Sequence, residues 1–399
     1  MFTNDPFEVQ FGAFKKKEDQ NPEKISFIHA SDIHLGSYQY RNEYRANDFI
    51  FAFQEILRLA LYYQVDFILL GGDVFTSLEM LPGNLLKIVD NLKNFKEYTN
   101  GNIPIIAIEG NHDIRRFSRG VRFSCRGQSW LKLIANLGLI VLLDADMEAP
   151  AEKMFSPYDF NENKGGKIQI KNVIIYGNRY LNENPEHYIP KIKNAIKKDI
   201  NYFCILLQHY GIEGQMKNVP GIKFTKVLPL KEKVDYLALG HYHLQFSLDG
   251  WIFNPGSSEA VCLADSYFKR GVFLVEVKRK NKKFFKNIKS IRLTNRKNLR
   301  EIIHFRTQFI KKNELNELII KRLKNNLQFL DSKILPSNTE MPILYLILKG
   351  NKPANSCKIN EKEIRKIICE IFPVVDVKIY QKFDNPIKTL DGFIKVYNF

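Results

Sequence analysis

The sequence lacks the apolar segments that membrane and secreted proteins carry. None of its 399 residues belongs to an apolar run of 18 or more, which excludes a membrane-spanning helix. Residues 1–24 contain neither the apolar core nor the small-residue cleavage site of a secretory signal, so we expect a polar N-terminal tail there. A membrane is therefore not expected among the partners.

Cysteine is scarce. The five cysteines are an odd number, they are scattered, and no two have the Cys-x-x-Cys spacing. This argues against a disulfide framework and against a zinc-thiolate site. A reducing compartment fits best: the cytoplasm, with the protein associated with the nucleoid, or the nucleus in a eukaryote. The cysteines are Cys125, Cys204, Cys262, Cys357 and Cys369.

Acidic residues are few in one long stretch. The net charge is +17, and the segment from Lys269 to Lys324 holds 19 Lys and Arg against four Glu. The electrostatic field of such an excess of positive charge attracts polyanions such as nucleic acid. A solvated, lysine-rich face on a small domain explains the same charge, and charge alone does not separate the two explanations.

Apolar runs and helical patterns alternate over the first two-thirds of the chain. Helical patterns occur at residues 48–63 and 85–95, and residues 244–256 and 271–280 alternate like antiparallel strands. With 45% hydrophobic residues, this predicts an α/β domain at residues 25–279, built on a mixed sheet or on two packed sheets with outer helices. The buried strands are expected at residues 25–32, 65–73, 103–110, 139–144, 173–179, 202–209 and 234–241.

The pattern changes after about residue 280. A basic strand, a helix, a strand, a helix and a strand follow, which predicts a small α+β domain at residues 280–383. Residues 384–399 carry no clear fold signal and are expected to form a C-terminal tail. The expected elements are residues 284–293, 314–330, 342–350, 361–371 and 375–383.

Polar residues stand where five of the expected strands end. The carboxyl ends of parallel strands meet at one edge of an open α/β sheet, so residues far apart in the sequence are brought together there. These residues offer oxygen and imidazole groups without a thiolate, a set that suits Mn, Fe or Zn. In chain order they are Asp32, His34, Asp73, Asn111, His112, His209, His241 and His243.

The number of donors favours a centre with two metal ions. Seven groups, His112 apart, exceed what one ion needs, and two ions that share a carboxylate clamp a phosphoryl group. Asp73 is the natural bridge. Each motif alone has an ordinary explanation, such as a turn at the Gly-Asp pair, a helix cap at Asn111 or a hydrogen-bonded His209. Their conjunction at successive strand ends makes that explanation improbable.

These motifs resemble those of the calcineurin-like metallophosphoesterases, whose fold packs two mixed sheets as a sandwich between helices. Within that superfamily they are similar to the SbcD-like nucleases of DNA double-strand-break repair, the branch that includes the meiotic recombination nuclease. The resemblance covers residues 25–275, and the domain at 280–383 resembles the capping domain of that family in element order. The motifs are HASDIHLG, LLGGDVF, EGNHD, LGHYH and NPGS.

The resemblance implies a role for each residue and two Mn²⁺ ions as cofactors, with Mg²⁺, Fe²⁺ or Zn²⁺ as alternatives. His112 is not a ligand in the family; it assists the phosphate transition state or protonates the leaving oxygen. Some relatives have a second histidine three residues after the bridging aspartate, where Thr76 stands here and is expected to contact DNA. The first ion is held by Asp32, His34, Asp73 and His243, and the second by Asp73, Asn111, His209 and His241.

A track of arginines follows His112 directly. Arginine forks suit phosphate oxygens, and two phenylalanines lie among them. We expect these arginines to contact DNA, although a surface loop charged for solubility is the alternative. The arginines are Arg115, Arg116, Arg119, Arg122 and Arg126.

The sequence therefore favours a Mn²⁺-dependent DNA exo- or endonuclease. The family implies a homodimer and an SbcC-like coiled-coil ATPase partner, whose binding helices are not evident here. A phosphatase or phosphodiesterase acting on a smaller phosphoester, or a DNA-binding scaffold with weak nuclease activity, are the alternatives. His29, His187 and His304 are expected to be structural.

Overall fold

The computed structural model describes residues 24–114, 128–182, 184–306, 312–327, 341–352, 359–384, 387–388 and 394–395. The chain forms two compact units, Met1–Asn295 and Arg296–Phe399, which we call unit 1 and unit 2. Among the described residues, no helix combines the length and the apolar character that crossing a bilayer requires.

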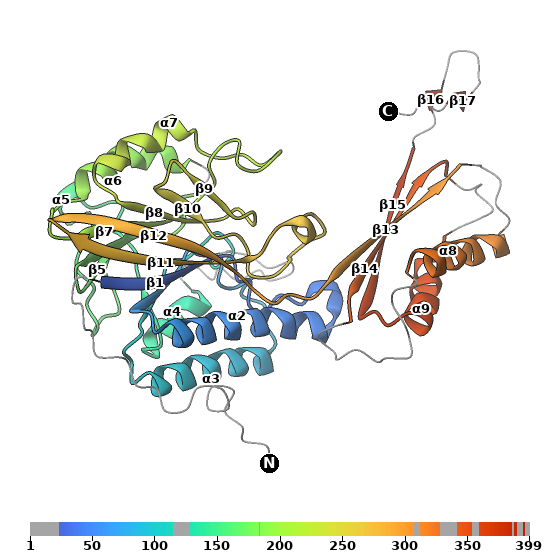
Figure 1. Cartoon of the computed structure of the whole chain (residues 1–399), viewed down its shortest axis with the longest axis horizontal. Coiled ribbons are helices and arrows are strands. Elements are labelled where there is room, and N and C mark those ends of the chain that lie inside the picture. The colour runs from blue at the N-terminus through green and yellow to red at the C-terminus, as the bar shows by residue number, and fades with distance from the viewer. Residues whose placement is uncertain are drawn as a thin grey trace. The chain divides into compact units, whose positions relative to one another are not determined.

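Unit 1 contains two six-stranded sheets (Figure 1). In sheet 1 the order is β12-β11-β1-β2-β3-β4, with β1 to β4 parallel and β11 and β12 antiparallel. In sheet 2 the order is β5-β6-β7-β8-β10-β9, with a parallel centre from β6 to β10. Sheet 1 comprises β1 (Lys24–Ala30), β2 (Phe67–Leu70), β3 (Ile105–Ala107), β4 (Val141–Leu142), β11 (Gly271–Lys280) and β12 (Lys283–Arg292). Sheet 2 comprises β5 (Lys167–Ile170), β6 (Val173–Gly177), β7 (Phe203–His209), β8 (Tyr236–Gly240), β9 (Phe246–Leu248) and β10 (Ile252–Asn254).

The two sheets pack face to face over a shared core. Alternate residues of a strand point to opposite faces, so Phe27 and Phe67 point toward sheet 2 while their neighbours point toward the helices. The rings of Phe27 and Phe67 stack with centroids 4.8 Å apart, and Tyr236 of sheet 2 meets Phe27 edge to face at 5.4 Å. Apolar residues at every other position therefore join the sheets.

Helices cover the outer face of each sheet (Figure 1). On α2, buried Ile50, Phe53, Leu57 and Ala60 recur at helical spacing and pack on sheet 1. The predicted sandwich of two mixed sheets between helices is confirmed. The helices over sheet 1 are α2 (Glu43–Tyr63), α3 (Pro82–Tyr98) and α4 (Trp130–Asn136), and those over sheet 2 are α5 (Ala151–Met154), α6 (Ile189–Ala195) and α7 (Phe224–Val227). Short 3-10 turns are η1 (Gln39–Arg41), η2 (Pro185–Tyr188), η3 (Leu228–Glu232) and η4 (Ala264–Tyr267).

The basic strand after residue 280 belongs to unit 1 rather than to the second unit. β12 pairs with β11 along its whole length, through a two-residue turn in which Asn281 and Lys282 have φ of 51° and 62°. Phe284 and Ile288 on β12 pack against the core between the sheets, and Lys283 and Lys289 are exposed. The division between the units therefore lies after Asn295, later than the position expected after residue 279.

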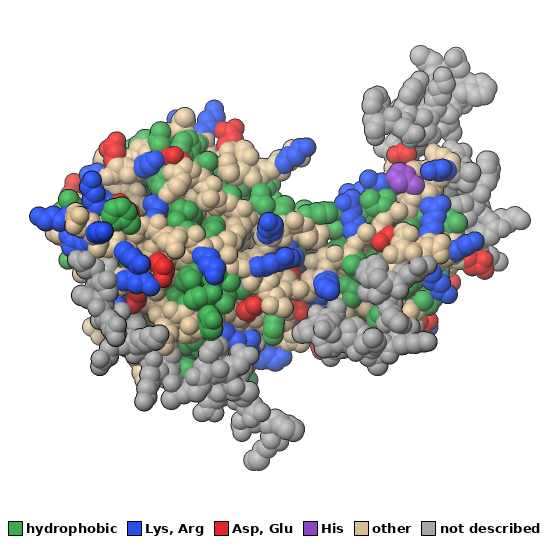
Figure 2. All heavy atoms as spheres, in the orientation of Figure 1, with side chains coloured by type: hydrophobic (Ala, Val, Ile, Leu, Met, Phe, Trp, Pro, Cys, Tyr) green, Lys and Arg blue, Asp and Glu red, His purple; other side chains and the backbone are tan. Residues whose placement is uncertain are grey.

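The positive charge of the stretch from Lys269 to Lys324 is thus divided between the units. Figure 2 shows lysine and arginine side chains along the part of unit 1 that β11 and β12 cross in Figure 1. β12 is an edge strand, and lysines on an edge keep other strands from pairing with it.

Unit 2 contains a three-stranded parallel sheet of order β13-β14-β15. Its helices bury Leu315, Ile319, Ile364 and Ile368 in a separate core with the sheet. The last four elements expected for this domain are present. Its first strand is β13, because the basic strand expected there is β12 of unit 1. The elements are β13 (Asn298–Phe305), α8 (Lys312–Asn326), β14 (Ile343–Gly350), α9 (Glu361–Ile371), β15 (Asp376–Phe383), and the short pair β16 (Ile387–Lys388) and β17 (Ile394–Lys395).

Candidate metal centre

The carboxyl ends of five parallel strands bring the expected donors to one edge. Asp32 follows β1, Asp73 follows β2, Asn111 follows β3, His209 ends β7 and His241 follows β8. The two sheets are joined at this edge, because Nδ1 of His209 lies 2.7 Å from the carbonyl oxygen of Gly71.

The backbone at this edge is strained. Asp32, His34, Asp73 and His241 have φ of 50°, 55°, 49° and 93°, in the left-handed region that side chains larger than glycine rarely adopt. Such strain persists where the surrounding structure enforces it, and it clusters at functional sites. Four strained donors at three strand ends therefore indicate a site rather than ordinary turns.

Two glycines allow the strand ends to approach each other. A Cβ atom on Gly72, whose φ is 91°, would lie 2.5 Å from Nδ1 of His209. A Cβ atom on Gly110 would lie 2.2 Å from Oδ1 of Asp73. The glycines of the GGD and EGNHD motifs are therefore required by the close packing of the donors.

Asp32, His34 and His243 form the first cluster of donors. One ligand atom from each lies within 4.8 Å of the others. The Nε2 atoms of His34 and His243 are 3.1 Å apart, and Nε2 of His243 is 3.9 Å from Oδ1 of Asp32. Asp32 and His34 are fully buried, and His243 is partly exposed.

Asp73, Asn111, His209 and His241 form the second cluster. Oδ1 of Asn111 lies 3.1 Å from Nε2 of His209 and 3.0 Å from Nδ1 of His241. Nε2 of His209 is also 3.4 Å from Oδ2 of Asp73. Asp73 belongs to two groups of potential ligands, one with Asp32 and His209 and one with His34 and His112, so its carboxylate lies between the clusters.

The donor atoms fit a cation. A carbonyl oxygen can only accept a hydrogen bond, so the 2.7 Å contact with Gly71 places the hydrogen of neutral His209 on Nδ1. The lone pair on Nε2 then faces the oxygens of Asn111 and Asp73, which also carry lone pairs. Groups that would otherwise repel one another are stabilised when a positive ion lies between them.

The pKa values of the buried groups describe the same electrostatics. Burial lowers the pKa of His209, but the charge and hydrogen bond of Asp73, together with Asp32, outweigh it and raise the pKa to about 9. Burial raises the pKa of Asp73, yet His209 and the neighbouring imidazoles hold it well below its usual range. A positive charge is therefore stabilised next to Asp73.

The other imidazoles are held neutral. Burial lowers the pKa of His34 to about 3. Burial, together with the charge of His209, lowers the pKa of His241 to about 4. Neutral imidazole is the form that binds metals, so both rings are ready to act as ligands.

Comparison with known proteins identifies the family. The family model of calcineurin-like phosphoesterases matches residues 25–245, more than half of the chain. The chain belongs to the calcineurin-like phosphoesterase family. It is a metal-dependent hydrolase of phosphoesters, and the resemblance stated from the sequence motifs is confirmed.

This phosphoesterase is similar to archaeal proteins described as DNA double-strand break repair protein Mre11. That of Archaeoglobus fulgidus is 27% identical over 61% of this chain and 52% of its own length. That of Sulfurisphaera tokodaii is 25% identical over 86% of this chain and 78% of its own length. That of Saccharolobus solfataricus is 23% identical over 92% of this chain and 84% of its own length. The chain thus spans about half the length of the first relative and most of the other two.

His112 lies beside the candidate metal ligands. Its backbone N–H donates to Oδ1 of Asp73 at 2.7 Å, and its Nδ1 lies 2.9 Å from the carbonyl oxygen of Thr76. Nδ1 must therefore carry hydrogen, which leaves Nε2 for a substrate or an ion. The ring meets that of His34 edge to face, with centroids 4.9 Å apart.

Thr76 contacts two histidines of the site. Its hydroxyl donates to the carbonyl oxygen of His34 at 2.8 Å, while its own carbonyl holds the ring of His112. That hydrogen is not available to a phosphate oxygen. Thr76 therefore positions two histidines of the site.

Two carboxylates at the site were not found from the sequence. Oδ2 of Asp265 lies 2.7 Å from Nδ1 of His243, and this hydrogen bond, together with the charge of Asp32, raises the pKa of His243 against the effect of burial. Asp113 accepts the N–H groups of Gly110 and Phe75 at 2.9 and 2.8 Å, which ties two ligand loops together. The signal for Asp113 was its place directly after the GNH sequence; Asp265 lies in the 3-10 turn η4, whose sequence has no recognisable pattern.

The remaining residues named from the sequence are the arginines after His112 and three further histidines. The arginines at 115, 116, 119, 122 and 126 lie outside the described residues. His29 is a structural histidine, as expected: it is fully buried, with Nδ1 3.0 Å from the hydroxyl of Tyr236 and Nε2 3.1 Å from the carbonyl of Leu239. His187 and His304 are exposed and lie outside the two clusters.

Proposed function

We propose that this phosphoesterase is a two-metal nuclease that hydrolyses DNA phosphodiester bonds in the processing of double-strand breaks. The observation that carries the proposal is the convergence of Nε2 of His209 with the oxygens of Asp73 and Asn111 at one edge of the sandwich. The relatives are described as DNA double-strand break repair proteins, which supports DNA as the substrate.

The donors divide into two sets that share Asp73. We assign the ions as Mn²⁺, since the set contains imidazole and oxygen ligands without thiolate, although Mg²⁺, Fe²⁺ or Zn²⁺ suit parts of it. When bound, the two ions supply Lewis-acid stabilisation of the phosphoryl oxygens. The first set is Asp32, His34, Asp73 and His243, and the second is Asp73, Asn111, His209 and His241.

His112 is the proposed general acid. Its Nδ1 hydrogen is committed to the carbonyl of Thr76, which fixes the ring and leaves Nε2 for the substrate. A protonated imidazole donates a hydrogen bond to a phosphoryl oxygen and a proton to the leaving oxygen. The hydrogen bond from its backbone N–H to Asp73 holds His112 next to the carboxylate that the two sets share.

DNA contacts and partners are assigned from sequence and similarity. We propose that the five arginines at 115–126 bind the phosphate backbone and that unit 2 acts as the capping domain. The proposed partners are a second copy of this chain, in a homodimer, and an SbcC-like coiled-coil ATPase. The proposed location is the cytoplasm, in association with the nucleoid, or the nucleus in a eukaryote. A salt-dependent loss of DNA affinity is expected if lysine and arginine supply these contacts.

An assay with two substrates tests the proposed function. Purified protein is given Mn²⁺ or Mg²⁺ and either DNA, single- and double-stranded, or a generic phosphomonoester. We expect hydrolysis of DNA with Mn²⁺ and poor hydrolysis with Mg²⁺. Efficient cleavage of the monoester with both DNA forms intact would instead favour a phosphatase. Tight, salt-sensitive DNA binding without turnover would favour a scaffold.

A further inference from the structure

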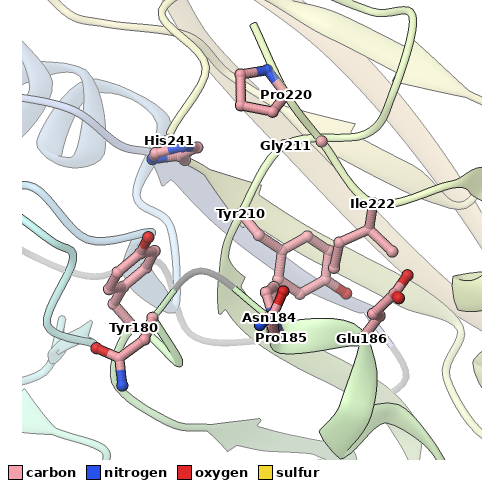
Figure 3. A pocket seen from close by; sticks show the side chains of 11 residues that line it. Tyr180, Asn184, Pro185, Glu186, Tyr210, Gly211, Pro220, Ile222 and His241 are labelled. Atoms are coloured by element: carbon pink, nitrogen blue, oxygen red, sulfur yellow. The ribbon is translucent and has the colours of Figure 1, made fainter.

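A pocket opens directly beside the metal centre (Figure 3). Its volume is about 560 Å³, within the range of about 300–1,000 Å³ typical of small-molecule sites. His241, whose Nδ1 contacts Asn111, forms part of its wall. The rest of the wall comes from Tyr180, Asn182 and residues 184–186 after β6, and from residues 210–211 and 220–222 after β7. A group bound in the pocket would therefore adjoin a phosphate at the metal centre.

The pocket presents aromatic and apolar surfaces. The ring of Tyr180 stacks beside that of His241, with centroids 6.0 Å apart and planes 29° apart. Tyr210 is 4% exposed and gives a rigid wall with Pro185 and Ile222, which are also buried. Figure 3 shows Tyr180 and His241 on one side of the view and Tyr210 with Ile222 and Glu186 on the other. Such surfaces suit a flat ring, because bases stack on aromatic side chains.

The charge of the pocket excludes a phosphate as its occupant. Among the described residues that line it, none is lysine or arginine, and the charged one is Glu186, which is half-buried. Asn182 and Asn184 supply further polar groups at the exposed side. A carboxylate accepts hydrogen bonds, so it favours an uncharged ligand that carries an amino group.

We propose that this pocket binds the nucleobase of the nucleotide whose phosphate lies at the metal centre, and that it prefers adenine, cytosine or guanine to thymine. Tyr180 and Tyr210 supply stacking surfaces, and Glu186 accepts a hydrogen bond from the exocyclic amino group that thymine lacks. The inference rests on the proposed nuclease function, because it assumes a nucleotide substrate.

The pocket continues into a second hollow of about 620 Å³, which shares Tyr180, Asn182 and Asn184 with it and adds His187 and Tyr188. Both hollows lie along one segment after β6, so the neighbouring nucleotide of a strand has space beside the bound base.

The test measures binding of small ligands to the Mn²⁺-loaded protein by calorimetry. The ligands are dAMP, dCMP, dTMP and deoxyribose 5-phosphate, which lacks a base. We expect dAMP and dCMP to bind at least about tenfold more tightly than deoxyribose 5-phosphate, in line with the contribution of base stacking. We expect dTMP to bind more weakly than dCMP.

Two variants locate the effect. Asn184 is exposed and its side chain makes no cap hydrogen bond, so Asn184→Trp fills the pocket at little cost to the fold. It should weaken dAMP about tenfold and leave deoxyribose 5-phosphate unchanged. Asn161→Trp, at an exposed residue outside the pocket wall, is the matched control. Glu186→Ala should abolish the preference for dCMP over dTMP.

The outcomes separate this inference from the proposed function. If DNA is hydrolysed but dAMP and deoxyribose 5-phosphate bind equally, or Asn184→Trp has no effect, the base pocket is rejected and the nuclease stands. If DNA stays intact and no nucleotide binds, both proposals fail together.

Discussion

Oδ2 of Asp265 lies 2.7 Å from Nδ1 of His243, so the hydrogen of that ring stands on Nδ1 and Nε2 faces Asp32 and His34. Carboxylates that orient a ligating histidine in this way typically contribute about 10- to 100-fold to metal affinity or activity. Asp265→Asn retains an oxygen for the N–H groups of Val261 and Cys262 but loses the charge. We expect about tenfold weaker Mn²⁺ binding, measured by calorimetry.

Asp66→Asn is the control for loss of a buried carboxylate. Asp66 accepts the N–H of Ser26 at 2.8 Å and precedes β2, at the end of the sheet opposite the metal edge. Its replacement should lower stability without a change in Mn²⁺ affinity. Equal metal affinity of the Asp265→Asn variant and the wild type would remove the positioning role of Asp265.

The second prediction concerns His112. We expect His112→Ala to bind both ions normally and to lose hydrolysis by a factor of about 10²–10⁴, the usual contribution of a general acid. Turnover of DNA and metal content are measured on the same sample. His304→Ala, at an exposed histidine outside both hollows and both clusters, should change neither quantity.

His112 shares a potential ligand group with His34 and Asp73. A loss of one metal equivalent in His112→Ala would therefore show that the ring is a ligand and not an acid. Full retention of activity would exclude both roles.

The third prediction concerns pH and His29. Burial lowers the pKa of His29 to about 3, so the folded state keeps the ring neutral where the unfolded state, near 6.5, already binds a proton. Above pH 6.5 the ring is neutral in both states and does not change the free energy of unfolding. As the pH falls from 6.5 toward 3, the free energy of unfolding decreases by about 1.4 kcal/mol per pH unit.

In His29→Gln the side chain does not titrate, so the unfolded state no longer binds this proton. Urea unfolding of both metal-free proteins between pH 6.5 and 5 should give a slope of the unfolding free energy against pH that is smaller in the variant by about 1.4 kcal/mol per unit. Parallel slopes for the two proteins would show that His29 titrates in the folded state near its usual value.

The fourth prediction concerns Thr76. Thr76→Val removes the hydroxyl that donates to the carbonyl of His34 but keeps the shape of the side chain and the carbonyl that holds His112. We expect a loss of about 1 kcal/mol in the unfolding free energy, typical of one hydrogen bond. DNA affinity of the metal-loaded protein should stay unchanged. A fall in DNA affinity with unchanged stability would instead make Thr76 a DNA contact.

The sequence predicted the sandwich and the place of the site because both depend on simple periodicities. β1, β2, β7 and β8 are runs of buried apolar residues, and a polar donor follows or ends each of them. Since parallel strands end at one edge, the meeting of Asp32, Asp73 and His209 follows from the topology alone.

Other features did not follow from periodicity. The units divide after Asn295 rather than near residue 280, where the pattern of elements changes. The pairing of β12 with β11 depends on the turn at Asn281 and on Phe284 and Ile288, which that pattern does not reveal. Asp265 was missed because its role depends on tertiary packing, which brings it to His243 from the turn η4.

Crystals soaked in Mn²⁺ and measured at the manganese absorption edge test the metal centre most directly. The account predicts two anomalous peaks about 3.5–4 Å apart, with Asp73 in contact with both and with His209 and His243 on opposite ions. A single peak, or two peaks with Asp73 in contact with neither, would contradict it.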